Sequence, residues 1–448
     1  MDAWLTRPAA EQGRALARGE IDARALTEAY LDAIAAHPDT PRIYTESTDA
    51  RAKAEAAAAA DRLGAGKAAG PLDGVPISWK DLYDVAGYGC QGGTKLLAGR
   101  KAEADAAVVA RGTAAGTVCL GKTHTTELAF SGLGVNPMTA TPPNAIEAAR
   151  APGGSSSGAA VSTKLGLAAL GIGSDTGGSV RIPAAWNDLV GLKTTAGLIP
   201  LNGVISLSPT YDTVGPLTRT VEDAALMFSI LANAPVPDWS NGTLADETLH
   251  LAETVVLDGC EPAVIDAVED VLAPLSAKGM AISRGPVPEF DTLYGAIGDV
   301  GAIVPSEAWA LWGETIEANP NTMWPPIEAR FRMGQGVPAA QDNAALMAFA
   351  KTAQAVHARM ADQGLIVCPT APMRPPEAQR LIDDADYFAE KNMLGLRNTR
   401  IGNLLGLSSI TLPTRTPMCG LMIMAPPGSE ARLLSIAAAI EIAIGAKS

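Results

Sequence analysis

The 448-residue chain is predicted to fold as an α/β protein. Three observations predict this class. Short apolar runs alternate with longer stretches of helical spacing, clusters of Gly, Ser and Thr separate them, and 47% of the residues are hydrophobic while 18% are charged. Alternating strands and helices are typical of a sheet covered by helices, with functional groups on the loops at strand ends.

Residues 1–65 are predicted to form a helical N-terminal layer. Apolar side chains recur there at the spacing of one helix face. They are Leu16, Ile21, Leu26, Tyr30, Leu31 and Ile34, and an alanine-rich run follows at 54–60.

Residues 70–225 are predicted to form the core of the sheet, because they consist of short apolar runs separated by Gly, Ser or Thr clusters. The predicted strands are Val75–Ile77, Val118–Leu120 and Ala168–Ile172.

Residues 235–360 are predicted to be mainly helical. Helical spacing covers Pro262–Leu275 and Ala339–Ala361, and Thr254–Leu257 is expected to be a strand.

Residues 361–448 are predicted to return to the sheet through apolar runs at 365–372 and 405–414, before a final helix from about Glu430. No Pro-rich, Ser-rich or charged linker and no repeat divides residues 1–448, which favours a single domain.

Charge and cysteine content exclude several classes of function. Lys and Arg number 34 against 48 Asp and Glu, so the net charge of −14 excludes a basic nucleic-acid-binding surface spread over the molecule. Five separated cysteines without a CxxC pair favour a reducing compartment. The start of the chain does not resemble a signal peptide, and the apolar stretch Leu433–Ala446 is too short to span a membrane. We expect a cytoplasmic protein without nucleic-acid or membrane partners.

Two short motifs are weak matches to known sites. Residues 116–123 fit the P-loop pattern GxxxxGK[ST], but their centre is itself a predicted strand and not a phosphate-binding loop. Residues 154–158 fit the GxSxG pattern, which requires a later histidine. His250 is expected at the surface and His357 on the solvated side of a helix, so neither fits that role.

The other two histidines, His37 and His124, precede the GxSxG match and do not supply its later histidine. His124 and Glu127 lie one helical turn apart, but two ligands without others are weak evidence for a metal site. We therefore predict no metal site.

A stronger constellation needs no histidine. Lys80 follows an apolar run in the segment 71–81, residues 151–158 form a Gly/Ser loop before a helical stretch, and residues 173–183 form a second glycine loop that carries Ser179. Two such loops and a buried lysine can build a hydrolase in which lysine replaces histidine as the base. The alternative is that the glycines only make turns and that Lys80 only pairs with Asp81.

These segments resemble the amidase signature family of serine hydrolases. The resemblance rests on residues 71–81, 121–137, 151–158, 171–195 and 212–226 and covers most of the chain. It implies a single large amidase-signature domain, with a central mixed β-sheet flanked by helices on both faces. Relatives include bacterial amidases, aryl acylamidases and urethanases.

The resemblance also implies the roles of individual residues. Ser179 is the expected nucleophile, Ser155 the bridging serine after a cis peptide bond, and Lys80 the base. For Lys80 to be neutral near pH 7, burial must lower its pKa from about 10.4, which takes roughly 4–5 kcal/mol. The oxyanion hole is expected from the backbone N–H groups of Thr176, Gly177, Gly178 and Ser179, with Asp175 and Arg181 as supports.

Departures from the family pattern concern the substrate. Ser157 adds a hydroxyl to the Gly/Ser loop, Trp79 is expected to narrow the cavity, and the divergent segment 136–150 is expected to shape substrate access. The expected pocket residues are Phe130, Ser131, Leu133 and Met138.

The resemblance predicts an amidohydrolase that forms an acyl-serine intermediate and uses no metal or organic cofactor. The apolar pocket residues favour an uncharged or partly apolar small molecule, such as an anilide or a carbamate. The alternatives are the amidase subunit of a tRNA-dependent amidotransferase, which releases ammonia from glutamine or asparagine, and an inactive binding protein. We expect a monomer or a homodimer.

Overall fold

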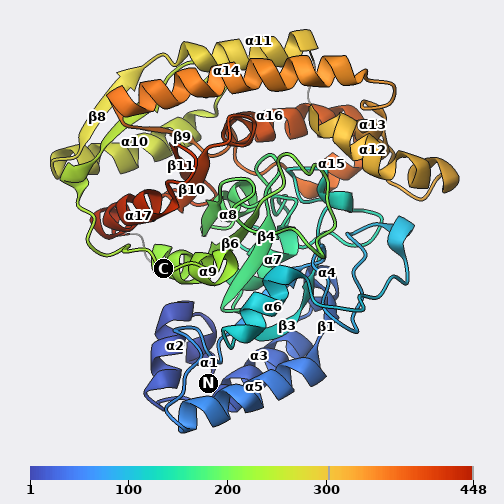
Figure 1. Ribbon diagram of the computed structural model, residues 1–448, viewed down its shortest axis with the longest axis vertical. Coiled ribbons are helices and arrows are strands. Elements are labelled where there is room, and N and C mark those ends of the chain that lie inside the picture. Colours follow the sequence, from blue (N-terminus) through green and yellow to red (C-terminus); the bar gives the residue numbers. More distant parts are fainter. Residues whose placement is uncertain (301–302, 446–448) are drawn as a thin grey trace.

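The computed structural model describes residues 1–300 and 303–445 of the chain (Figure 1). Its described strands form one eleven-stranded sheet in the order β1-β3-β2-β4-β6-β5-β10-β11-β9-β7-β8. Their bounds are β1 Tyr44–Ser47, β2 Pro76–Lys80, β3 Val118–Thr123, β4 Leu170–Ser174, β5 Val190–Lys193, β6 Val214–Thr218, β7 Thr248–Ala252, β8 Ala281–Gly285, β9 Leu365–Pro369, β10 Ser408–Pro413 and β11 Gly420–Ala425.

The sheet is mixed, as expected. β2 runs parallel to β3 and β4, and β7 runs parallel to β8 and β9. The remaining pairs are antiparallel, and one of them joins β1, from within the N-terminal helical segment, to β3.

Helices cover both faces of the sheet, which confirms the predicted α/β class. Successive side chains of a strand point to opposite faces. On β2, Ser78 lies 2.9 Å from Ser162 of α7, whereas Trp79 packs against Gly112 of α6. Trp79 therefore faces away from Lys80, and the expectation that it narrows the cavity is wrong.

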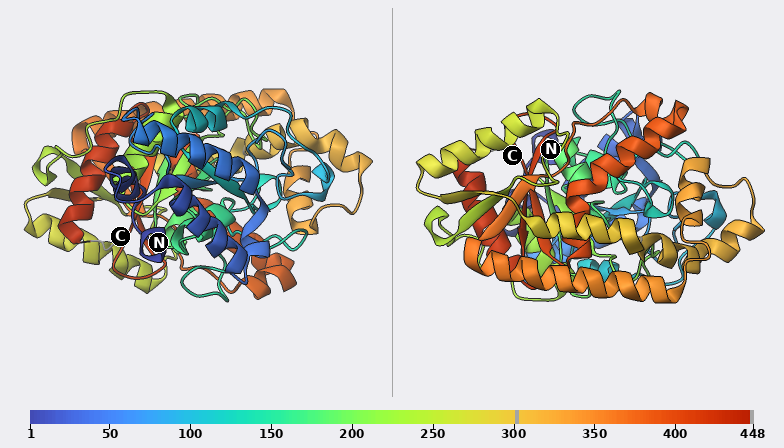
Figure 2. Two further views of the ribbon diagram at one scale, coloured as in Figure 1. Left: turned by 90° about the horizontal axis from the view of Figure 1, so that it is seen from below. Right: turned by 90° about the horizontal axis from the view of Figure 1, so that it is seen from above.

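The N-terminal helices lie at one end of the molecule's long axis, and α11 with α14 lies at the other (Figures 1 and 2). The helices of the first half are α1 Asp2–Leu5, α2 Ala9–Ala17, α3 Ala23–Ala36, α4 Thr40–Ile43, α5 Asp49–Gly64, α6 Ala107–Ala114, α7 Ser157–Lys164, α8 Arg181–Trp186 and α9 Val221–Ala232. The helices of the second half are α10 Pro262–Ala277, α11 Pro288–Val300, α12 Ile303–Ala318, α13 Pro325–Arg332, α14 Ala339–Gln363, α15 Ala378–Asp383, α16 Ala385–Leu404 and α17 Glu430–Ile444. Short 3₁₀ turns are η1 Lys95–Leu97, η2 Glu127–Ala129 and η3 Leu244–Asp246.

Small aliphatic side chains build much of the core. The alanine-rich run becomes α5, which buries Ala52, Ala56 and Ala59 on one face. Such small side chains allow the helix to approach the sheet closely. None of the described helices is long and apolar enough to cross a bilayer.

One predicted strand is misplaced. Thr254–Leu257 forms a turn in which Val255 adopts a φ of 60°, and the strand is Thr248–Ala252 instead. β7 pairs on both sides, with β8 and β9, and its residues from Leu249 to Ala252 are buried. His250 is 4% exposed and its Nδ1 lies 2.8 Å from Ser283 Oγ, so its predicted surface position is wrong.

Candidate active site

Lys80 ends strand β2 inside the protein and contacts two serine hydroxyls. Its Nζ donates to Ser155 Oγ at 2.7 Å and to Ser174 Oγ at 2.8 Å. Burial lowers the pKa of Lys80 to about 7, although the carboxylates of Asp175 and Asp212 favour its charged form. A neutral amine is therefore available near pH 7, as a general base requires.

The expected alternative, an ion pair between Lys80 and Asp81, is absent among the described contacts. Asp81 instead accepts from Lys122 Nζ at 2.9 Å. Lys122 belongs to strand β3, which contains the centre and end of the P-loop-like motif. That motif is thus part of the sheet, as its apolar centre predicts.

The three consecutive serines of the Gly/Ser loop have different partners. Ser155 follows a cis Gly154–Ser155 peptide bond, the feature implied by the family resemblance, and accepts from Lys80. Ser156 Oγ accepts from the backbone N–H of Ser174 at 3.3 Å. Ser157 begins α7 and donates to the carbonyl of His124 at 3.3 Å. The additional hydroxyl of Ser157 is therefore used away from Lys80.

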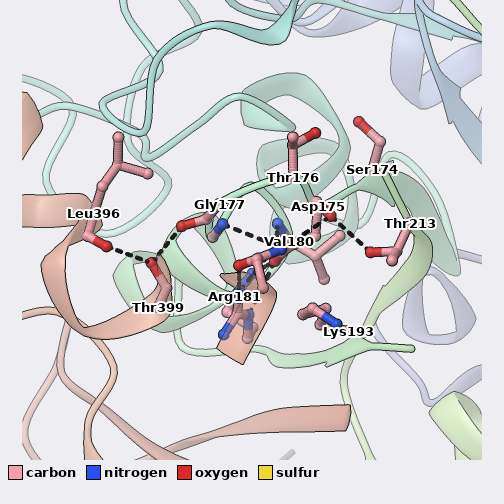
Figure 3. Close-up of polar contacts among 12 residues, drawn as sticks. Ser174, Asp175, Thr176, Gly177, Val180, Arg181, Lys193, Thr213, Leu396 and Thr399 are labelled. Carbon is pink, nitrogen blue, oxygen red and sulfur yellow. Dashed lines mark hydrogen bonds and ion pairs between the residues drawn. The ribbon is translucent and has the colours of Figure 1, made fainter. Parts of the chain in front are cut away.

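Ser179 lies on the loop between β4 and α8, which bends around Asp175 (Figure 3). The Asp175 carboxylate accepts from Gly178 N at 2.8 Å, Val180 N at 3.1 Å and Arg181 Nη2 at 2.9 Å. Burial alone would raise the pKa of Asp175, but the Arg181 charge and these hydrogen bonds hold it below its usual value. A charged carboxylate thus fixes the loop backbone, as expected for a supporting pair.

The loop also brings Ser179 next to the Gly/Ser loop, because Ser156 N donates to the Ser179 carbonyl at 3.2 Å. Gly178 N–H is engaged by Asp175 and cannot reach a substrate. Of the four N–H groups expected to form the oxyanion hole, those of Thr176, Gly177 and Ser179 have no acceptor among the described residues.

A cavity of about 210 Å³ opens at these three residues. Its walls come from segments far apart in the chain: Ala129, Phe130, Ser131, Thr176, Gly177, Ser179, Leu207, Ile297, Val304, Pro305, Arg330, Met333, Met393, Leu396, Arg400 and Leu404. Phe130 and Ser131 were predicted to line it.

Two other pocket predictions are wrong. Leu133 is fully buried in an apolar cluster and Met138 packs against the same cluster, and neither lines the cavity. The segment 136–150 does not line it either; α11–α13 and α16 do. Long-range packing of these helices, and not the divergent loop, sets the cavity's shape.

Several residues near the site are not predicted from the sequence. Ser174 and Asp212 lie inside the motifs at 171–195 and 212–226, so the signal available for them is a polar residue within a recognised motif. Asp212 accepts from Thr176 Oγ1 at 2.5 Å and from Leu207 N at 3.0 Å, so it holds two cavity residues. Arg330 and Arg400 lie in helices without any motif, and no local signal could have placed them here.

The remaining histidines lie away from this cavity. His357 is half-buried on α14, so its predicted solvated position is only partly correct.

Glu127 accepts from Thr94 Oγ1 and from the backbone of Trp324, which ties η2 to the start of α13. No group of three metal-ligating side chains occurs in the described part of the chain.

Comparison with known proteins agrees with this arrangement. The sequence profile of the Amidase family matches residues 25–434. The chain is 35% identical to the 2-amino-5-chloromuconic acid deaminase of Comamonas testosteroni, over 97% of this chain and 96% of that one. It is 33% identical to a glutamyl-tRNA(Gln) amidotransferase subunit of Chloroflexus aggregans, over 74% of this chain and 71% of that one. A solved structure titled "Crystal structure of amidase" superposes with a TM-score of 0.87 at 26% identity, covering 98% of this chain and 100% of that one.

The family match and the superposition on a solved amidase structure show an enzyme of the amidase type, a hydrolase of C–N bonds. The chain belongs to the Amidase family, the amidase-signature family that its motifs resemble.

Proposed function

We propose that the enzyme hydrolyses a C–N bond of a small amide through an acyl intermediate on Ser179, with Ser155 as proton relay and Lys80 as base. The contact between Lys80 Nζ and Ser155 Oγ, 2.7 Å long and fully buried, carries this proposal. The proposal assigns no step to a metal or an organic cofactor.

In the first half-reaction, Ser179 Oγ attacks the substrate carbonyl carbon while its proton passes to Ser155, whose own proton passes to neutral Lys80. The carbonyl electron pair moves to oxygen, and the N–H groups of Thr176, Gly177 and Ser179 stabilise the resulting oxyanion. Losing one such donor typically costs about 3–4 kcal/mol of activation free energy.

Collapse of the tetrahedral intermediate breaks the C–N bond, and the leaving nitrogen takes a proton from Lys80 through Ser155. In the second half-reaction, a water molecule gives a proton to the same relay and attacks the acyl ester. The C–O bond to Ser179 then breaks, and the serine regains its proton as the acid product leaves.

The relatives suggest two kinds of substrate. The Comamonas testosteroni relative is named a 2-amino-5-chloromuconic acid deaminase, and its similarity spans nearly the whole chain. This favours a small free substrate from which a nitrogen group is released. Anilides and carbamates stay predictions of the sequence.

The alternative function, ammonia release from glutamine or asparagine within an amidotransferase, is supported by the similarity to the amidotransferase subunit of Chloroflexus aggregans. Strict glutamine or asparagine preference, or co-purification of a partner chain, would favour it. Cell fractionation and size-exclusion chromatography test the predicted cytoplasmic location and the monomeric or dimeric state.

The test is product release from a panel of primary amides, p-nitroanilides, aryl carbamates and glutamine. Ser179→Ala, Ser155→Ala and Lys80→Ala should each lose at least about 10³-fold in kcat/KM while remaining folded, because the relay needs every member. Ser157→Ala is the matched control and should retain activity, since the only hydrogen-bond partner of the Ser157 hydroxyl in the described part of the chain is the His124 carbonyl, and the substitution leaves the backbone bond from Ser157 N to the Ser155 carbonyl in place. Wild-type turnover in Ser179→Ala would refute the mechanism.

A further inference from the structure

Two arginine side chains line the same cavity as Ser179. Arg330 comes from α13 and Arg400 from α16. Neither forms an ion pair with any Asp or Glu of residues 1–300 and 303–445; their protein contacts are a carbonyl, an aromatic ring and a methionine sulfur. The cavity therefore contains positive charge that the described chain does not neutralise.

Neighbouring side chains hold the two guanidinium groups on one wall. Arg330 Nε donates to the Phe130 carbonyl at 2.8 Å, and its guanidinium carbon lies 4.5 Å from the centroid of the Phe130 ring. Met393 Sδ lies 4.0 Å from Arg330 Nη1 and 3.7 Å from Arg400 Nη2. Other N–H groups of both side chains remain without an acceptor in the described structure and are available to a ligand.

The electrostatics of this wall favour an anion. Burial, together with the charge of Arg400, lowers the pKa of Arg330 to about 9. Two like charges in a partly desolvated site destabilise each other. The net charge of the chain is −14, so this patch does not belong to a generally basic surface. A bound anion would offset the repulsion and satisfy the free donors.

We propose that Arg330 and Arg400 bind a carboxylate of the substrate, so that the enzyme acts on a small amide that also carries an acid group. The inference rests on the proposed function, which places the scissile carbonyl at Ser179. The planar guanidinium group matches a carboxylate with two parallel hydrogen bonds. The sequence predicts an uncharged or partly apolar substrate, and this assignment replaces the uncharged alternative.

The cavity volume limits the distance between the two groups. At about 210 Å³ it is smaller than the roughly 300–1,000 Å³ typical of pockets for drug-sized ligands. The amide and the carboxylate must therefore be separated by only a few bonds.

The kinetic test compares acids with uncharged amides of equal carbon number: succinamic acid with butyramide, and glutaramic acid with valeramide. We expect kcat/KM to be about 10- to 100-fold higher for each acid, the range given by a charge-assisted hydrogen bond. Arg330→Met and Arg400→Met should each remove most of this preference, chiefly through KM, and should slow the uncharged amides far less than the acids. Equal rates for acid and amide in the wild type, or variants that slow both alike, would overturn the proposal.

Arg332→Met is the control, because Arg332 lies on the same helix but pairs with Glu328 at the surface. It should leave the preference for acids intact. Thermal melts by circular dichroism check folding, and since the two cavity arginines lie on different helices, a defect in one variant leaves the other informative.

A binding experiment separates this proposal from the catalytic one. Succinate, the product expected from succinamic acid, is titrated calorimetrically into Ser179→Ala at low ionic strength. We expect binding that weakens at least about 10-fold when Arg330→Met or Arg400→Met is added. Absence of succinate binding, or a succinate affinity that is unchanged by Arg330→Met and by Arg400→Met, refutes the carboxylate site. An active Ser179→Ala variant with arginine-dependent succinate binding refutes the proposed nucleophile and leaves the carboxylate site standing.

Discussion

Three lysines buried in the sheet show how partners decide the chemistry of one residue type. Lys122 pairs with Asp81, and although burial opposes it, this carboxylate raises the lysine's pKa. Lys193 donates to two backbone carbonyls, and burial with the nearby Arg181 charge lowers its pKa to about 7. Only Lys80 combines a lowered pKa with contact to serine hydroxyls. The serine partners therefore distinguish the expected base.

The first prediction concerns the pH dependence of the reaction. Since Lys80 must be neutral to accept a proton and its pKa is lowered to about 7, kcat/KM should rise about tenfold per pH unit below pH 7 and level off above it. The measurement is a pH–rate profile at two temperatures, because the pKa of an amine falls on warming while that of a carboxyl group hardly changes.

Glu127→Gln is the control for this profile, because burial also raises the pKa of Glu127 to about 7. The inflection should persist in that variant. A profile that flattens in Glu127→Gln, or an inflection that does not move with temperature, would contradict the assignment to Lys80.

At the scale of elements, the loop between β4 and α8 depends on two glycines with different surroundings. Gly178 adopts a φ of 139°, and a Cβ there would lie 2.2 Å from Thr399 Oγ1. A Cβ on Gly177 would meet only Leu396 Cδ2, at 3.7 Å. The Thr399 hydroxyl already donates to the Gly177 carbonyl at 2.7 Å, so α16 holds this loop in place (Figure 3).

We therefore predict that Gly178→Ala lowers both thermal stability and kcat, because the clash and the unfavourable φ displace the oxyanion donors. Gly177→Ala should fold normally and mainly raise KM, since its methyl group enters the cavity. Melting temperatures and steady-state kinetics of both variants are the measurements. Equal melting temperatures for the two would show that the loop tolerates the displacement.

The contact between η2 and α13 supports one wall of the cavity. Glu127 accepts at 2.9 Å from Thr94 and at 3.0 Å from Trp324 N, the residue before α13. Its pKa is raised in the folded state to about 7 from 4.5, so its charged form destabilises the fold. The resulting loss of stability grows as pH rises from about 4.5 to about 7.

Glu127→Gln should therefore gain stability relative to the wild type as pH rises through this window. Glu127→Ala should lose about 1–3 kcal/mol for each donor left without an acceptor, and it should weaken substrate binding. Chemical denaturation at pH 5 and pH 8 measures both effects. A constant difference between Glu127→Gln and the wild type at the two pH values would contradict the raised pKa.

At the scale of the whole molecule, one buried ion pair joins the loop of Ser179 to the C-terminal third of the chain. Arg181 contacts Asp175 at 2.9 Å, Asn403 of α16 and Met422 of β11, and both members of the pair are fully buried. Asn403 also donates to Asp175 at 2.9 Å. The same charges thus shape the loop and attach α16, which carries Arg400 to the cavity.

Arg181→Met should lower the free energy of unfolding by about 3–5 kcal/mol, because it leaves the Asp175 charge buried and unpaired. Adding Asp175→Asn should restore part of the loss, since the two residues interact directly. Arg332→Met, which breaks a surface pair, should cost less than about 1 kcal/mol. Denaturant unfolding of the three variants measures these effects, and equal losses in Arg181→Met and Arg332→Met would contradict the importance of the buried pair.

The amino-acid pattern predicts the α/β class and the two loops that carry Ser155 and Ser179, and the family resemblance adds the mixed sheet. In each of the two loops, a strand, a glycine turn and a helix start follow one another within a few residues. The motif therefore predicts both the loop and the serine that it carries. The family resemblance also indicated the cis bond before Ser155.

The surroundings of the two loops depend on packing between distant segments. The strand at Thr248–Ala252, the burial of His250, the direction of Trp79 and the exclusion of Leu133 and Met138 from the cavity depend on which elements pack together. Arg330 and Arg400 line the cavity of Ser179 from helices more than 150 residues further along the chain. Local sequence specifies turns and strands, whereas a cavity wall forms from contacts between distant segments, which no single segment encodes.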